Sequence, residues 1–233
     1  MEIISSKYLK SAVGKESPEK VLGWYDESSP GPDGMSALFF KVHWENLKDR
    51  MLKGYQEALN TGEFIQEINH TFITLIPKFK KPERIEEYRP IACYNVIYKI
   101  LSKIICMRLN KVLPQLISQS QSAFIKGRFI SENSLMAHEL IREFNKKGAD
   151  RVCLKIDLHK AYDKVSRQFI LHMLHEMGVP AKLLKLITHC ICTPKFSVII
   201  NGIPKGYIKT NRGIRQGDPL SPYPFAVAME WFS

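Results

Sequence analysis

The alternation of apolar and polar positions in the first half of the chain predicts helices and a short strand. Apolar residues recur at helical spacing over residues 36–55 and again over 97–112, before Pro114. Between these stretches, the β-branched run 71–76 stops at Pro77, which predicts a strand. The polar face of the second helix is expected to carry Lys99, Lys103 and Lys111.

The second half of the chain also mixes predicted helices with predicted strands. Helical spacing predicts helices over 131–147, 169–177 and 181–191. The segment 152–157 alternates apolar and polar residues and predicts a strand, and 196–202 predicts a hairpin because Asn-Gly suits a type I′ turn. No repeat or long linker divides the chain, so the pattern predicts an α+β fold.

Charge narrows the class of partner. The chain has 34 Lys and Arg against 23 Asp and Glu, a formal charge of +11, which is expected of a protein that binds polyanions. Ribosomal proteins, membrane-surface proteins and some basic enzymes share this surplus. No apolar run approaches the roughly 20 residues that span a bilayer, and residues 1–17 lack the apolar core of a secretory signal. We therefore expect an intracellular protein, nuclear or cytoplasmic, with no membrane partner.

The five cysteines are scattered and form no CxxC pair, which favours a reducing compartment over a disulfide framework. His189, Cys190 and Cys192 lie close together, as in some zinc sites. A fourth ligand at suitable spacing is missing, however, and the segment continues an apolar helical pattern. We expect buried core thiols here.

Asp157 is the strongest candidate for chemistry. It ends a predicted strand, where a charge is unfavourable unless a cation or hydrogen-bond donors compensate it. Magnesium prefers one or two carboxylates together with phosphate oxygens, so such an aspartate suits phosphoryl or nucleotidyl transfer. Taken alone, an aspartate at this position more often caps the next helix.

The neighbouring residues change that balance. The segment KIDLHKAYDKV around Asp157 resembles the first palm motif of reverse transcriptases, and RQGDPLSPYPF resembles their second. Upstream, SPGPDG, INHTFITLIPK, YRPIACYNVIYKILSKIICMRL and QSAFIKGRFISEN follow the order and approximate spacing of the finger motifs in plant non-LTR (LINE-type) retrotransposon polymerases. The resemblance covers residues 29–233.

This resemblance implies the fingers and part of the palm of a right-hand polymerase. Residues 29–126 would be the fingers and 127–233 a palm truncated before its Asp-Asp motif, while 1–28 stay unassigned. The implied activity is RNA-directed DNA polymerisation with Mg²⁺, dNTP, an RNA template and a DNA primer. Oligomeric state is not implied.

Three residues near the first palm motif acquire roles from the resemblance. Asp157 matches the metal-ligating carboxylate, and the Leu158 carbonyl would be a second ligand. Tyr162 falls under the sugar of the incoming nucleotide, where most relatives have phenylalanine and where a ring excludes a 2′-hydroxyl. Core packing is the alternative role for Tyr162. Asp163 is expected to accept hydrogen bonds near the turn rather than to bind metal.

Other positions are implied to contact the nucleotide or the template. Lys78 and Arg89 match the finger residues that hold the triphosphate, and Arg can bind phosphate bidentately. Gln216 and Gly217 would line the nucleotide pocket. The alternatives are solvated surface charge for the two cations and a simple turn before a helix for the other two.

A basic loop is implied to contact the template backbone. It carries Lys126 and Arg128 on either side of a glycine. Its alternative is a solvated loop.

The chain departs from the family in its carboxylates. A two-metal polymerase needs more than Asp157, and the family supplies an Asp-Asp hairpin further on. No Asp-Asp pair occurs in the 233 residues, and the sequence ends at Ser233. We therefore expect this chain alone to be catalytically incomplete. A non-catalytic RNA- or DNA-binding remnant and a non-functional relic are the alternatives. Pro224 also replaces the leucine usual in the family, and a helix tolerates a proline only in its first turn.

Overall fold

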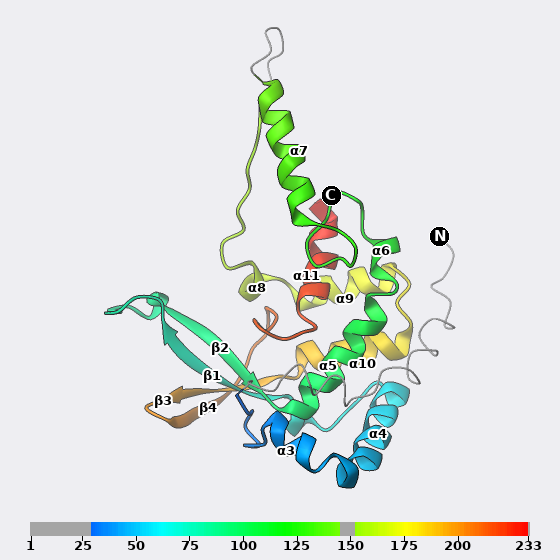
Figure 1. Cartoon of the computed structure of the whole chain (residues 1–233), viewed down its shortest axis with the longest axis vertical. Coiled ribbons are helices and arrows are strands. Elements are labelled where there is room, and N and C mark those ends of the chain that lie inside the picture. Colours follow the sequence, from blue (N-terminus) through cyan, green and yellow to red (C-terminus); the bar gives the residue numbers. More distant parts are fainter. Residues whose placement is uncertain (1–28, 145–151, 233) are drawn as a thin grey trace.

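One mixed sheet organises the strands in the part of the chain that the computed structural model describes, residues 29–144 and 152–232. The strands are β1 (His70–Pro77), β2 (Tyr88–Tyr94), β3 (Lys195–Ile200) and β4 (Ile203–Lys209). Their order is β2-β1-β3-β4, with β1 and β3 parallel and the outer pairs antiparallel (Figure 1). The parallel pair sets His70 opposite Lys195, so it joins distant parts of the sequence.

The predicted strand at 71–76 and the predicted hairpin at 196–202 are confirmed as β1 and as β3–β4. Asn201 and Gly202 both have positive φ, at +51° and +77°, as a type I′ turn requires. Strand β2 was not predicted, because it contains Pro90 and lacks alternation. A proline is tolerated there because β2 is an edge strand, where a missing N–H breaks no ladder on the open side.

Helices cover most of the remaining described residues. They are α3 (Ala37–Val42), α4 (Trp44–Thr61), α5 (Val96–Leu109), α6 (Leu113–Leu116), α7 (Ile130–Glu143), α8 (Ala161–Lys164), α9 (Arg167–Glu176), α10 (Ala181–Cys192) and α11 (Pro222–Met229), with short 3₁₀ turns η2 (Gln66–Asn69), η3 (Ile85–Glu87) and η4 (Glu230–Phe232). The predicted helices at 131–147, 169–177 and 181–191 correspond to α7, α9 and α10; the last residues of the first lie outside the described ranges. The predicted helix at 36–55 is divided into α3 and α4 at His43.

Helix α5 is the centre of the core. Most of its residues are buried, on all sides, and they pack with buried residues of α4, α9, α10 and α11. The prediction that Lys99 lies on an exposed face is wrong: the residue is 6% exposed. Its ammonium donates to the Ser29 carbonyl at 3.1 Å, because the loop that precedes α3 folds over the start of α5.

The predicted strand at 152–157 is wrong for this structure. No described strand pairs with the segment, and Val152, Leu154 and Ile156 are 92%, 79% and 70% exposed. Alternation predicts which side chains share a face, but a strand forms only where a neighbour supplies backbone partners. Helix α7, which precedes this segment, extends away from the sheet (Figure 1) and has no buried residue among those described.

The structure also tests the expectations for the cysteines and for Pro224. Cys190 is buried as predicted, whereas Cys192 is exposed. Among the described residues, no group of three His, Cys, Asp or Glu side chains is placed to hold a metal ion. Pro224 lies in the first turn of α11, the position that a helix tolerates. Within the same ranges, no helix has the length and apolar character needed to cross a bilayer.

Candidate active site

One cavity of about 610 Å³ collects four of the residues implied in nucleotide contact. Lys78 follows the end of β1, Arg89 lies in β2, and Gln216 and Gly217 belong to the loop before α11. The sheet brings the first two together because the β1–β2 register sets Arg89 opposite Ile76, two residues before Lys78. The fold therefore gathers at one surface cavity residues that are up to 139 positions apart in sequence (78 to 217).

The finger loop holds Lys78 in place. Its main-chain N–H donates to the Glu87 carbonyl at 2.8 Å, which closes the loop between β1 and β2. Its ammonium donates to the Glu86 carbonyl at 2.7 Å. Lys78 and Arg89 are both exposed, so their charges face solvent at the mouth of the cavity.

The opposite wall is the Gln216–Gly217 turn. The Gln216 amide donates to Asp163 Oδ1 at 3.2 Å, so Asp163 accepts a hydrogen bond near the turn, as predicted. Gly217 has φ +88°, a left-handed conformation that favours glycine, and its carbonyl accepts from the Tyr94 hydroxyl. No atom lies within 4 Å of where a Gly217 Cβ would be, so this wall is open backbone.

A buried ion pair lies directly beneath that turn. Arg215 Nη2 and Asp218 Oδ2 are 2.8 Å apart, and each side chain is 4% exposed. The Asp218 carboxylate also accepts from the Tyr98 hydroxyl at 2.6 Å and from the Ser102 hydroxyl at 2.6 Å. The Arg215 guanidinium lies 4.1 Å from the Tyr98 ring centroid. Burial, partly opposed by Arg215, raises the Tyr98 pKa well above its usual value.

This ion pair brackets Gln216 and Gly217 in sequence, so it anchors both ends of the turn to α5. Sequence analysis missed it, because charged residues in a loop are ordinarily solvated. The spacing of Arg and Asp three residues apart, next to a turn glycine, is the only signal that the sequence offered.

A second set of hydrogen bonds joins α8, its C-cap residue and the first residue of α9 to the loop that leads into the turn. Arg167 donates through Nε to the Gly213 carbonyl at 2.7 Å and through its other nitrogens to Thr210. The Gly213 N–H donates to the Val165 carbonyl at 2.9 Å, and the Ile214 N–H to the Tyr162 carbonyl at 2.8 Å. These hydrogen bonds join the two palm-motif segments directly.

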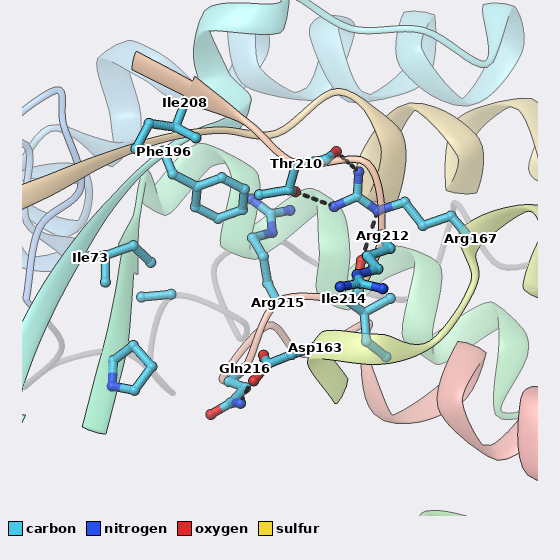
Figure 2. A pocket seen from close by; sticks show the side chains of 13 residues that line it. Ile73, Asp163, Arg167, Phe196, Ile208, Thr210, Arg212, Ile214, Arg215 and Gln216 are labelled. Carbon is cyan, nitrogen blue, oxygen red and sulfur yellow. Dashed lines mark hydrogen bonds between the residues drawn. The ribbon is translucent and has the colours of Figure 1, made fainter. Parts of the chain in front are cut away.

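Figure 2 shows this junction from the side of a smaller cavity, of about 310 Å³. Arg167 reaches Thr210, and Gln216 lies beside Asp163. The backbones approach so closely that a Cβ on Gly213 would lie 2.7 Å from the Asp163 carbonyl oxygen. Glycine is required at 213 for this contact and for its φ of +79°.

Asp157 and Leu158 lie in a different cavity, of about 440 Å³, which α9, α11 and η4 also line. Asp157 is exposed. A lone carboxylate with a neighbouring carbonyl fits part of the coordination shell of one Mg²⁺ ion, whose other ligands are ordinarily water and phosphate. The described residues do not assemble the larger donor set of a two-metal site.

The remaining predicted residues have distinct surroundings. The Tyr162 ring stacks on Phe225 with centroids 4.7 Å apart, and burial raises the pKa of its hydroxyl. Lys126 is exposed. The Arg128 guanidinium donates to four main-chain carbonyls, those of Pro114, Ile117, Ser118 and Gln121. Tyr162 therefore packs against α11, and Arg128 closes its own loop; their nucleotide and template roles stay predictions.

Comparison with known proteins assigns these motifs to a family. A family model described as reverse transcriptase (RNA-dependent DNA polymerase) matches residues 76–233, more than half of the chain. The transposon TX1 uncharacterized 149 kDa protein of Xenopus laevis is 29% identical over 204 residues, covering 88% of this chain and 16% of that protein. A Pol polyprotein from the type-2 retrotransposable element R2DM of Drosophila melanogaster is 27% identical over 203 residues, covering 87% and 19%.

A shorter match concerns plants. An uncharacterized mitochondrial protein of Arabidopsis thaliana, AtMg01250, is 49% identical over 43 residues, or 18% of this chain and 35% of that protein. The resemblance to plant elements in particular stays a prediction. The chain spans between 16% and 29% of the length of the first four retrotransposon relatives.

Proposed function

This chain belongs to the reverse transcriptase (RNA-dependent DNA polymerase) family, and on that premise we propose that its 610 Å³ cavity binds the triphosphate of an incoming dNTP. The observation that carries the proposal is the convergence of Lys78, Arg89, Gln216 and Gly217 on that one cavity. The whole protein would act as an RNA-directed DNA polymerase of a LINE-type element, on an RNA template with a DNA primer.

The chemistry of the cavity suits that ligand. Negative charge on a triphosphate needs cationic partners, and Lys78, just after β1, and Arg89, in β2, supply them. Gln216 is already oriented by its hydrogen bond to Asp163, and Gly217 leaves its wall free of a side chain, so backbone can approach a ligand.

The other assignments complete the proposal. Residues 29–126 would form the fingers and 127–233 the palm. Asp157 and the Leu158 carbonyl are the residues that would hold Mg²⁺, which neutralises phosphate charge when bound. Tyr162 would exclude ribonucleotides, and Lys126 with Arg128 would face the template.

Titration of the purified chain with a fluorescent dATP analogue tests the proposal. Arg89→Ala and Lys78→Ala should each weaken binding about tenfold, the effect of losing one charge-assisted contact. Lys53→Ala, an equal loss of charge at an exposed site on α4, is the matched control. Equal affinity in all four proteins would refute the cavity assignment.

We also propose that the 233-residue chain does not polymerise by itself. It contains no Asp-Asp pair, and the described residues gather no cluster of three carboxylates. Primer extension on an RNA template is the measurement. Incorporation of dNTP that disappears in Asp157→Ala would show that this expectation is wrong.

A second candidate function is nucleic-acid binding without catalysis, which the +11 charge favours. The logarithm of RNA affinity should then fall steeply with the logarithm of salt concentration. No detectable RNA binding at low salt would exclude it. For the remaining alternative, a relic that does not fold, a sharp cooperative thermal melt would be the contrary result.

A further inference from the structure

A third cation lines the same cavity as Lys78 and Arg89; it belongs to the first palm motif, but the sequence analysis gave it no role. Lys160 reaches the cavity from the turn that precedes α8, a separate segment of the chain. Its side chain is exposed. Within the part of the chain that the structure describes, no hydrogen bond or ion pair holds its ammonium.

The backbone of Lys160 has an unusual conformation. Its φ is +51° and its ψ +46°, in the left-handed region that residues with a Cβ rarely adopt. A glycine would adopt this conformation without strain, and the Lys160 side chain makes no capping hydrogen bond for α8. The side chain therefore contributes nothing evident to the turn, and strained residues of this kind gather at functional sites.

The turn also couples Lys160 to the opposite wall of the cavity. Its carbonyl accepts from the Asp163 N–H at 3.0 Å, and Asp163 in turn holds Gln216. Among the charged side chains that line the cavity, Lys78, Arg89 and Lys160 are cationic, while Glu86 and Asp163 are anionic. The Asp163 carboxylate accepts from Gln216, and the Lys78 ammonium donates to the Glu86 carbonyl. Among the described residues none holds the Lys160 ammonium, so this cation is placed to meet an anion.

We propose that Lys160 binds the phosphate groups of the anionic ligand, as a third cation from the palm side that complements Lys78 and Arg89 from the fingers. The inference rests on the proposed function, since it places a phosphate-bearing ligand in this cavity. It adds a contact through which the two sides of the cavity hold one ligand.

Binding of inorganic tripolyphosphate and of dATP to the full chain, measured by calorimetry, tests this role. Lys160→Ala should weaken both affinities about tenfold, whereas Lys160→Arg should stay within about twofold because it keeps the charge. Lys160→Gly should lose affinity as the alanine variant does, yet melt about 2–4 °C higher, because glycine relieves the left-handed strain. That variant separates ligand contact from any structural role.

Lys164→Ala is the matched control. Lys164 is an exposed cation at the other end of α8, and it lines the neighbouring cavity instead. Equal losses in Lys160→Ala and Lys164→Ala would reduce the effect to overall charge and overturn the inference. Unchanged affinity in Lys160→Ala, with affinity lost in Arg89→Ala, would overturn it and leave the proposed function standing. Absence of binding by the wild-type chain would refute both.

Discussion

The buried pair of Arg215 and Asp218 permits a quantitative prediction. Asp218→Ala removes a carboxylate that is 4% exposed and leaves the Arg215 guanidinium buried without its counter-ion. Removing one partner of such a pair destabilises a protein by about 3–5 kcal/mol, because the remaining charge is neither solvated nor compensated. The hydroxyls of Tyr98 and Ser102 lose their acceptor as well, so we expect the upper part of that range.

That loss is large against the total stability of a domain, which is about 5–15 kcal/mol. For a chain of this size each kcal/mol lowers Tm by about 2–4 °C, so a loss of about 4–5 kcal/mol should lower the Tm of Asp218→Ala by about 8–20 °C. Urea denaturation followed by circular dichroism gives the free energy of unfolding directly.

Two controls isolate the effect of burial. Glu63→Ala breaks an ion pair of similar length, Lys185 Nζ to Glu63 Oε1 at 2.9 Å, whose side chains are both more than half exposed. This variant should have the same Tm as the wild type. The double variant Arg215→Met, Asp218→Leu removes both charges and should recover most of the lost stability. If Asp218→Ala unfolded within about 1 kcal/mol of the wild type, the pair would not anchor the turn, and the reasoning would be refuted.

Three further predictions concern the same fold; thermal melts followed by circular dichroism check their effects on stability, and RNA titration checks the effect of Lys126→Ala. Gly213→Ala should lower the free energy of unfolding by about 1–3 kcal/mol, because its Cβ would lie 2.7 Å from a main-chain oxygen. Gly202→Ala, which is also left-handed but lies in open space, should lower it less. Equal losses in the two variants would show that the close contact at Gly213 is not the cause. Arg128→Ala should lower Tm because four carbonyls lose their donor, whereas Lys126→Ala should leave Tm unchanged and weaken RNA binding; the opposite pattern would count against both roles. Burial, and to a lesser extent the charge of Lys195, lowers the pKa of His70 in the folded chain. As pH falls, His70 therefore takes up a proton more readily in the unfolded chain than in the folded one. The free energy of unfolding should consequently decrease below about pH 6.5. His70→Gln should flatten that decline, and an equally steep decline in the variant would exclude His70 as its source.

The elements that sequence alone determined are those whose signals are local. Helices α9 and α10 follow from apolar spacing within a few turns, and the β3–β4 hairpin follows from one Asn-Gly pair. The candidate nucleotide residues were also local, because each lies in a short motif. The helices and the hairpin have local physical causes, whereas the roles of the candidate nucleotide residues were implied by the family resemblance.

Tertiary structure decided everything that depends on a distant partner. Strand β2 pairs with β1 despite its proline, and β1 pairs with β3, because backbone donors elsewhere in the chain were available. The segment at 152–157 has the alternation of a strand but no described neighbour, so it is not one. Arg215 and Asp218 are buried only because α5 brings hydroxyl donors beneath the turn. A buried charge is stabilised by a counter-ion or a hydrogen-bond donor, and a strand edge by a neighbouring strand. The local sequence does not specify which distant residues supply these partners.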